Sequence, residues 1–314
     1  MLPCAFCKKN AGCAGDDLMA EKIDFEEMHE LALKRSGKPP FTAENIYVDL
    51  LLTATIGEIQ SKFDFVLKGG TAITKAWCQP YRFSYDLDFS KFDSKIARKQ
   101  YRKYQTELEK LVSELGFTIA NPENDKHREG GRILILKLVD APRHLRIPIK
   151  LSVSSIDSGP CIAPLRKEFK PAVKIPEKFK ILYPTIIPRV SGVSVKVLTM
   201  EELCAEKIRA LATRGAADEW SLLLRDVVDL YVMEKSGVLD AVLSGEWKSL
   251  RKKFDAVRDT SYWKKFRHFL STKPQEVRIH EEDLSIFFDT HAIDEKNASR
   301  IVEKVRLRLK EIFP

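Results

Sequence analysis

Apolar residues recur along the chain with two different spacings, and these spacings predict which segments are helices and which are strands. From Thr42 to about Phe63 the apolar positions return every three or four residues, as they do on one face of a helix. Residues 65–67 are a short apolar run, and residues 85–89 alternate apolar with acidic side chains, as a half-buried strand does. Further strands are expected at 117–120, 132–139, 145–153 and 194–198.

From residue 199 onward only the helical spacing is found. Thr199 followed by Glu202 has the pattern of a capping box, in which both side chains bond backbone N–H groups at the helix start. Before this helical part, residues 158–188 hold six prolines in a lysine-rich frame, which predicts an irregular segment. Helices are expected at 24–35, 72–77, 94–115, 199–211, 222–233, 247–254, 262–270, 274–288 and 292–312.

Strands followed by helices alone predict an α+β module and then a helical module. We expect a flexible tail at 1–20, an α+β domain at 21–198 and a helical C-terminal domain at 199–314. The tail contains three cysteines, Cys4, Cys7 and Cys13, in a spacing that leaves a metal site open. The alternative for these cysteines is free thiols in a reducing compartment.

The chain has 53 basic and 45 acidic side chains, a net charge of +8. This balance favours a polyanionic partner such as nucleic acid, although a soluble basic protein without such a partner fits equally well. An apolar content of 44% excludes a disordered or fibrous chain. The apolar runs fall far short of the roughly 18–20 residues that a bilayer requires, and the N-terminus lacks a secretory signal. We therefore expect a cytoplasmic protein without membrane contact.

Two acidic residues, Asp86 and Asp88, alternate along a predicted strand, so both side chains lie on the same face. Such a pair can converge on one cation, because Mg²⁺ takes few protein carboxylates and completes its shell with water and phosphate oxygens. A single D-x-D sequence is more often a solvated strand face. The interpretation as a metal site is supported by a second motif.

The second motif is Lys68-Gly69-Gly70-Thr71, which follows a predicted strand and precedes a predicted helix. A strand that runs through glycines into a helix presents backbone N–H groups to an anion, and Lys68 adds a positive charge. A Gly-Gly-Thr sequence by itself is more often a simple turn. Together, the two motifs indicate a site for a metal-bound phosphate.

These residues resemble a known family. Gly-Gly-Thr followed by Arg-Phe-Ser-x-Asp-Leu-Asp-Phe is similar to motif I of the AbiEii/AbiGii (MenT-type) nucleotidyltransferase toxins, a branch of the DNA-polymerase-β-like superfamily. A second block, Glu202 to Leu211 with Arg225-Asp226-Val227-Val228-Asp229-Leu230, resembles the helical motifs of the same family. The resemblance implies a mixed sheet flanked by helices, followed by an all-helical C-terminal domain.

The resemblance also implies roles for individual residues. Asp86 and Asp88 would bind catalytic Mg²⁺, with Mn²⁺ as an alternative, while Lys207 would contact phosphates and Asp226 would complete the active site. The residues expected to bind the nucleoside triphosphate are Lys68, Gly69, Gly70, Thr71, Ser84 and Lys150.

Lys150 marks a departure from the wider superfamily, which carries a third acidic residue on a later strand. This candidate strand, with the sequence from Arg146 to Ser154, offers Lys150, Ser152 and Ser154 on one face and no carboxylate. A second metal and the usual deprotonating carboxylate are therefore in doubt, and Asp226 is the best substitute base.

The implied activity is transfer of a nucleotide from an NTP to an RNA acceptor, tRNA in the better-understood relatives, by a toxin with a cognate antitoxin. The alternatives are transfer to a protein or small molecule, and an NTP- or RNA-binding module without catalysis. Basic segments that fit an RNA acceptor lie at 95–103 with Tyr101 and Tyr104, at 166–180, at 248–253 and at 264–267. Each of them could equally be a solvated helix face.

Overall fold

A computed structural model describes most of the α+β part and the C-terminal helices. The expected tail at 1–20, the helix at 24–35 and the expected first residues of two helices, Thr42 and Ser94, lie outside the described residues. The described residues are 43–78, 81–91, 98–115, 117–120, 131–138, 149–154, 162–171, 192–214, 220–244, 248–255, 260–272, 277–279, 284, 287–288 and 293–314.

The described strands form one seven-stranded sheet, in the order β3-β4-β5-β2-β1-β7-β6. Two neighbouring pairs, β2 with β5 and β1 with β7, are parallel, and the other pairs are antiparallel, so the sheet is mixed. The strands are β1 (Phe65–Lys68), β2 (Asp86–Lys91), β3 (Phe117–Ile119), β4 (Gly131–Leu138), β5 (Ile149–Ser154), β6 (Leu165–Phe169) and β7 (Val193–Val197).

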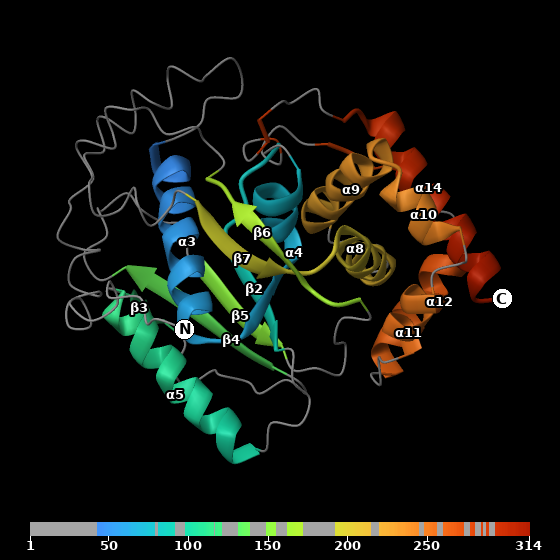
Figure 1. Ribbon diagram of the computed structural model, residues 1–314. Coiled ribbons are helices and arrows are strands. Elements are labelled where there is room, and N and C mark those ends of the chain that lie inside the picture. The colour runs from blue at the N-terminus through green and yellow to red at the C-terminus, as the bar shows by residue number, and fades with distance from the viewer. Residues whose placement is uncertain are drawn as a thin grey trace, which may run out of the picture.

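Helices lie across the sheet and beside it (Figure 1). The first group is α3 (Ala43–Lys62), α4 (Gly69–Ala72), its π-helical continuation η1 (Ile73–Trp77) and α5 (Arg98–Glu114). The second group gathers on one side of the sheet in Figure 1 and comprises α8 (Met200–Arg214), α9 (Trp220–Lys235), α10 (Val238–Leu243), α11 (Lys248–Asp255), α12 (Thr260–Ser271) and α14 (Glu295–Ile312). The α+β fold is confirmed, while the domain boundaries stay a prediction. No described helix is both long and apolar enough to span a membrane.

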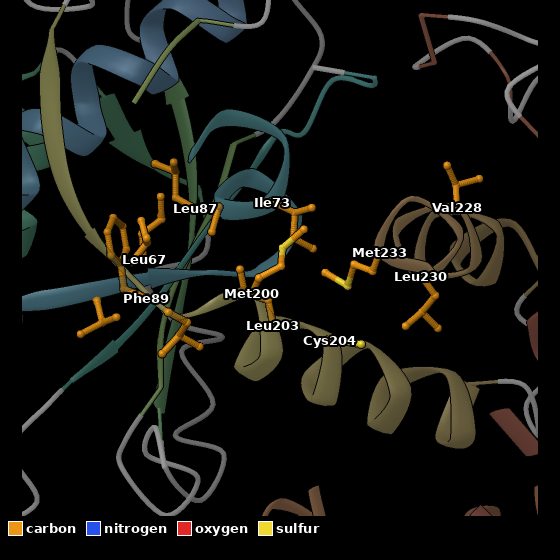
Figure 2. Close-up of a cluster of buried hydrophobic side chains, with 14 of the residues drawn as sticks. Leu67, Ile73, Leu87, Phe89, Met200, Leu203, Cys204, Val228, Leu230 and Met233 are labelled. Carbon is orange, nitrogen blue, oxygen red and sulfur yellow. The ribbon is translucent and has the colours of Figure 1, made fainter. Parts of the chain in front are cut away.

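A hydrophobic core joins the sheet to the C-terminal helices (Figure 2). Leu67 and Phe89 are buried on the central strands, and Leu203 on α8 and Met233 on α9 belong to the same buried cluster. Because the strands and helices share this core, the ends of β1 and β2 are held at a fixed position beside α8 and α9. The motifs singled out in the sequence lie in this region.

Three expectations about secondary structure are wrong. Residues 165–169 lie in the segment expected to be irregular but form β6, which pairs with β7 at the sheet edge. Val277–Ile279 fall in an expected helix but are not helical: the Val277 N–H donates to Ser299 Oγ and the Ile279 N–H to Glu295 Oε1. The short helix α10 was not expected, because six residues are too few for a clear period.

Candidate active site

The turn between β1 and α4 is built by Gly69. Its φ of 71° lies in the left-handed region, which lets the chain pass from the extended Lys68 into a helix within one residue. The helix therefore starts at Gly69, three residues before the expected start at Ala72. The Lys68 side chain makes no capping hydrogen bond, because its ammonium group has donors and no acceptor, and it brings a positive charge to the start of the helix.

The carboxylate of Asp88 lies directly against this turn. A Cβ atom placed on Gly69 would be 2.7 Å from Asp88 Oδ2, so only a glycine fits there without displacement. The other carboxylate oxygen, Oδ1, accepts a hydrogen bond from Ser152 Oγ on β5. Asp88 is thus oriented from two sides, beside the N–H groups of the Gly69–Gly70 turn.

Asp86 is surrounded by charges of both signs. Burial and the nearby negative charge of Asp88 raise the pKa of Asp86, and the positive charges of Lys150, Arg225 and Arg82 oppose this rise. Lys150 is the register partner of Asp86 on the parallel strand β5, and Ser152 is the register partner of Asp88. The wider superfamily carries a third carboxylate on this strand, but here β5 places Lys150 and Ser152 beside the two aspartates.

The acidic pair suits one hard divalent cation. Two carboxylates on alternate positions of β2 offer oxygen ligands, and a cation would relieve the repulsion that raises the pKa of Asp86. Within the part of the chain that the structure describes, no three His, Cys, Asp or Glu residues gather as a larger metal site. The donor set fits Mg²⁺, which keeps water and phosphate oxygens among its ligands.

The hydroxyl groups of Thr71 and Ser84 tie the glycine turn to β2. Thr71 Oγ1 donates to the Asp86 carbonyl oxygen at 2.5 Å and lies 2.9 Å from Ser84 Oγ. Both side chains are buried. Their contacts therefore fix the backbone of the turn relative to the strand that carries the acidic pair.

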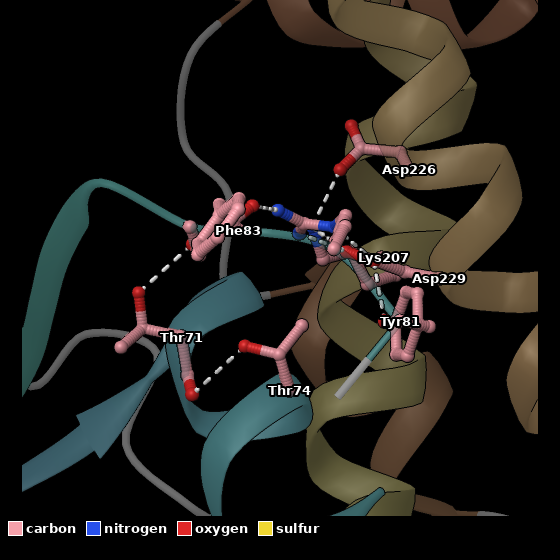
Figure 3. Close-up of polar contacts among 9 residues, drawn as sticks. Thr71, Thr74, Tyr81, Phe83, Lys207, Asp226 and Asp229 are labelled. Atoms are coloured by element: carbon pink, nitrogen blue, oxygen red, sulfur yellow. Dashed lines mark hydrogen bonds and ion pairs between the residues drawn. The ribbon is translucent and has the colours of Figure 1, made fainter. Parts of the chain in front are cut away.

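A buried ion-pair network brings Lys207 and Asp226 together beside this turn (Figure 3). Lys207 Nζ on α8 lies 2.6 Å from Asp226 Oδ1 and 2.7 Å from Asp229 Oδ2, both on α9. Asp229 also accepts from Tyr81 OH at 2.6 Å and from Arg82 Nε and Nη2 at 2.8 Å each. Sequence reasoning missed Tyr81, Arg82 and Asp229, although Arg82 and Asp229 stand within the two motifs.

The network holds Lys207 as a cation. Burial by itself would lower the pKa of Lys207, but Asp226 and Asp229 together raise it above its ordinary value, against a smaller opposing effect of Arg82. The side chain of Lys207 is 12% exposed, whereas that of Asp229 is fully buried. The positive charge of Lys207 is therefore stable and retains limited access to solvent.

Arg82 connects this network to the glycine turn. A Cβ atom placed on Gly70 would be 2.1 Å from Arg82 Nη2 and 3.2 Å from Ser84 Oγ. The same guanidinium is paired with Asp229 and is among the charges that act on Asp86. The residues predicted on β2 and on α8 and α9 are therefore linked through Arg82.

A second buried network lies on another face of α8. Lys253 of α11 is buried, with its Nζ 2.7 Å from Glu202 Oε2 and 3.3 Å from Glu206 Oε1. Burial alone would raise the pKa of Glu206, but Lys68, Lys253 and Arg209 lower it to about 2. Lys253 is therefore not available to an RNA, which corrects the expectation for this residue of the segment 248–253, while Arg251 in the same segment is exposed. The Thr199 cap is present, with the Glu202 N–H donating to Thr199 Oγ1 at 3.3 Å.

Comparison with known proteins places these features in a family context. Residues 50–305 match the profile of a family described as Nucleotidyl transferase AbiEii toxin, Type IV TA system. MenT4, a nucleotidyltransferase toxin from Mycobacterium tuberculosis H37Rv, has a similar structure: 16% identity and a TM-score of 0.53, over 92% of this chain and 90% of that chain. JHP933 from Helicobacter pylori is 13% identical, with a TM-score of 0.38 over 86% and 95% of the two chains. No curated protein matches the sequence. The likeness to MenT4 is a likeness of fold.

Proposed function

The chain belongs to the AbiEii family of nucleotidyl transferase toxins, and from this premise we propose that it transfers a nucleotide from an NTP to an RNA, with tRNA as the first candidate. The observation that carries the proposal is the contact between Asp88 and Gly69. It joins carboxylate oxygens that suit Mg²⁺ to backbone N–H groups that suit a phosphate. A nucleoside triphosphate with its bound metal matches both halves of this site.

Each part of the site has a role in the proposed reaction. The Gly69–Gly70 turn and Lys68 bind the triphosphate, Lys150 and Lys207 supply positive charge, and Asp86 and Asp88 would hold Mg²⁺. When bound, this ion would neutralise phosphate charge. The chemistry then consists mainly of positioning and charge neutralisation.

The bond changes of the transfer are simple. An acceptor hydroxyl oxygen forms a bond to the α-phosphorus, the bond from that phosphorus to the β-phosphate oxygen breaks, and pyrophosphate leaves with the bonding electrons. Asp226 is the carboxylate that we assign as acceptor of the hydroxyl proton, since β5 carries no acid beside Asp86 and Asp88. Its oxygen Oδ1 is ion-paired with Lys207 Nζ at 2.6 Å.

An exposed basic surface on α12 supports an RNA acceptor. Lys264, Lys265 and Arg267 are exposed, and none of them forms an ion pair with any residue that the structure describes. Arg300 and Lys304 on α14 differ, because both are paired with Glu234. Unpaired surface cations are the groups that neutralise a nucleic-acid backbone. Arg166 and Lys170, at the β6 edge, are also exposed.

Two alternatives lead to different products. In the first, the nucleotide is transferred to a protein or a small molecule, and in the second, the chain binds NTP or RNA without catalysis. The family description implies an antitoxin. We propose that it is a cognate protein and that both act in the cytoplasm.

The experiment that tests the proposal is incubation of the purified protein with Mg²⁺, total RNA and each of the four NTPs labelled at the α-phosphate. Label in an RNA band supports the proposal and identifies the preferred NTP. Label in protein or in a small molecule supports the first alternative. Absence of any labelled product with all four NTPs would reject transfer and support a binding module.

A further inference from the structure

Asp229 is the residue on which the buried network converges. Its two carboxylate oxygens accept hydrogen bonds from Tyr81 OH, from Arg82 Nε and Nη2, and from Lys207 Nζ, at distances between 2.6 and 2.8 Å. Tyr81 and Arg82 precede β2, whereas Lys207 comes from α8 (Figure 3). One carboxylate on α9 therefore contacts groups from both halves of the candidate site.

The contacts of Asp229 leave it no direct role in the chemistry. Its side chain has no exposed surface, and both of its oxygens are engaged by protein donors. Lys207 and Asp226 differ from it, because their side chains keep 12% and 2% of their surface exposed. Asp229 can act on a substrate only through the residues it holds.

Two of those residues have consequences for phosphate binding. Arg82 Nη2 packs behind Gly70, at a distance that leaves no room for a methyl group there. Lys207 is the cation that the sequence places next to the phosphates. The position of the glycine turn and the position of Lys207 therefore depend on the same carboxylate.

We propose that Asp229 is a positioning residue for nucleotide transfer, which sets the Gly69–Gly70 turn through Arg82 and holds Lys207 beside Asp226. The inference rests on the proposed function. It differs from a purely structural role in one respect: loss of Asp229 must change how the site binds and reacts with the triphosphate in a protein that is still folded.

The test compares Asp229→Asn with Tyr81→Phe as a matched control. The asparagine keeps the shape and removes the charge, whereas the control removes one hydrogen bond to Asp229 and leaves its two ion pairs. For Asp229→Asn we expect kcat to fall about 100-fold and KM for the NTP to rise, the size of effect that a misplacement of about 1 Å produces. For Tyr81→Phe we expect changes below about threefold.

The pH dependence of activity separates a positioning role from a purely structural one. A purely structural role of Asp229 would leave the alkaline limb of the activity profile unchanged. Among the residues that the structure describes, the charged groups that face Lys207 are Asp226, Asp229 and Arg82. Without Asp229, Asp226 is the one carboxylate of these that supports the protonated form of Lys207, so the pKa of Lys207 falls. Activity requires the protonated form of Lys207, so the alkaline limb of the pH profile should lie at a lower pH for Asp229→Asn than for the wild type.

Loss of Asp229 also leaves Arg82 buried without its ion pair, which can prevent folding. In that case Arg82→Met is compared with Asp229→Asn/Arg82→Met, a double variant with no unpaired guanidinium. The same shift of the alkaline limb is expected between these two proteins. Unchanged kcat, KM and alkaline limb in the folded variant would overturn the inference, provided that the wild type is active. A wild type without activity toward all NTPs and RNA argues against the proposed function itself.

Discussion

Gly70 lies so close to the guanidinium group of Arg82 that no side chain fits at position 70. A Cβ atom on Gly70 would lie 2.1 Å from Arg82 Nη2, and Arg82 is held in place by Asp229. The contact joins the turn that we propose to bind the triphosphate to the cation that links the sheet to α9. A substitution at either glycine of the turn is therefore informative.

Alanine at either glycine should disable the turn. Gly70→Ala forces Arg82 or the turn to move, at a cost of about 1–3 kcal/mol, and Gly69→Ala brings a methyl group to 2.7 Å from Asp88 Oδ2 at a left-handed φ of 71°. We expect KM for the NTP to rise at least about tenfold in both variants. Steady-state kinetics with varied NTP measures this.

Gly192→Ala and Gly237→Ala are matched controls for these variants. Both glycines have φ near that of Gly69, at 66° and 77°, but a Cβ atom on either would meet nothing within 4 Å. They carry the same backbone strain of about 1–2 kcal/mol without a clash. If the controls raise KM as much as Gly69→Ala does, general destabilisation explains the effect and the phosphate-binding role of the turn is rejected.

The sequence predicted the features that depend on local pattern. The strands from β1 to β5, the helix α3 and the capping residue Thr199 have strong periodic or capping signals, and the structure contains them. Strand β6 has no such signal, because Leu165, Arg166 and Glu168 are all exposed on an edge strand. Edge strands commonly carry charged residues, which resemble a loop in a sequence.

The candidate site was predictable where its parts are close along the chain. Asp86 and Asp88 share a face because they alternate on one strand, and the family motifs added Lys207 and Asp226. The pairing of Arg82 with Asp229 joins positions 147 residues apart, and nothing local in the sequence indicates it. The burial of Lys253 was equally hidden, since it directly follows the basic residues Arg251 and Lys252 and its partners lie on α8.

Lys253 should be important for stability rather than for RNA binding. Lys253→Met leaves Glu202 and Glu206 with an uncompensated negative charge in a buried place, so we expect the free energy of unfolding to fall by about 3–5 kcal/mol. Arg251→Met, at an exposed position on the same helix, should cost less than about 1 kcal/mol. Urea unfolding measures both. Equal stabilities of the two variants would show that the buried pair contributes nothing.

The low pKa of Glu206 predicts a specific loss of stability in acid. Its pKa is about 2 in the folded protein against 4.5 for an ordinary glutamate, so the charged form stabilises the fold. This contribution is complete above about pH 4.5 and is lost as the pH falls toward about 2. Glu206→Gln should be less stable than the wild type at pH 7, and the difference should shrink below pH 4.5. A difference in unfolding free energy between Glu206→Gln and the wild type that stays the same at every pH would contradict this prediction.

The basic surface of α12 should matter for the acceptor and not for the NTP. Charge reversal in Lys264→Glu/Arg267→Glu should raise KM for tRNA about tenfold at low salt, because each cation that neutralises a phosphate contributes to binding. The control Lys296→Glu/Lys310→Glu makes the same charge change at exposed positions of α14. The same KM for tRNA in both variants would remove α12 from the acceptor site and leave residues 166–170 and α5, where Arg98, Arg102 and Lys103 lie, as candidates.

The central claim is that Asp86 and Asp88, together with the Gly69–Gly70 turn, support transfer of the α-phosphate with its nucleoside. It is tested most directly by incubating the protein and RNA with NTP labelled at the α- or the γ-phosphate. We expect label in RNA from the α-position alone, only when Mg²⁺ or Mn²⁺ is added, and at least about 100-fold less in folded Asp86→Asn and Asp88→Asn. Asp64→Asn, at an exposed carboxylate, should match the wild type. Label from the γ-position, or full activity of either variant at Asp86 or Asp88, would contradict the claim.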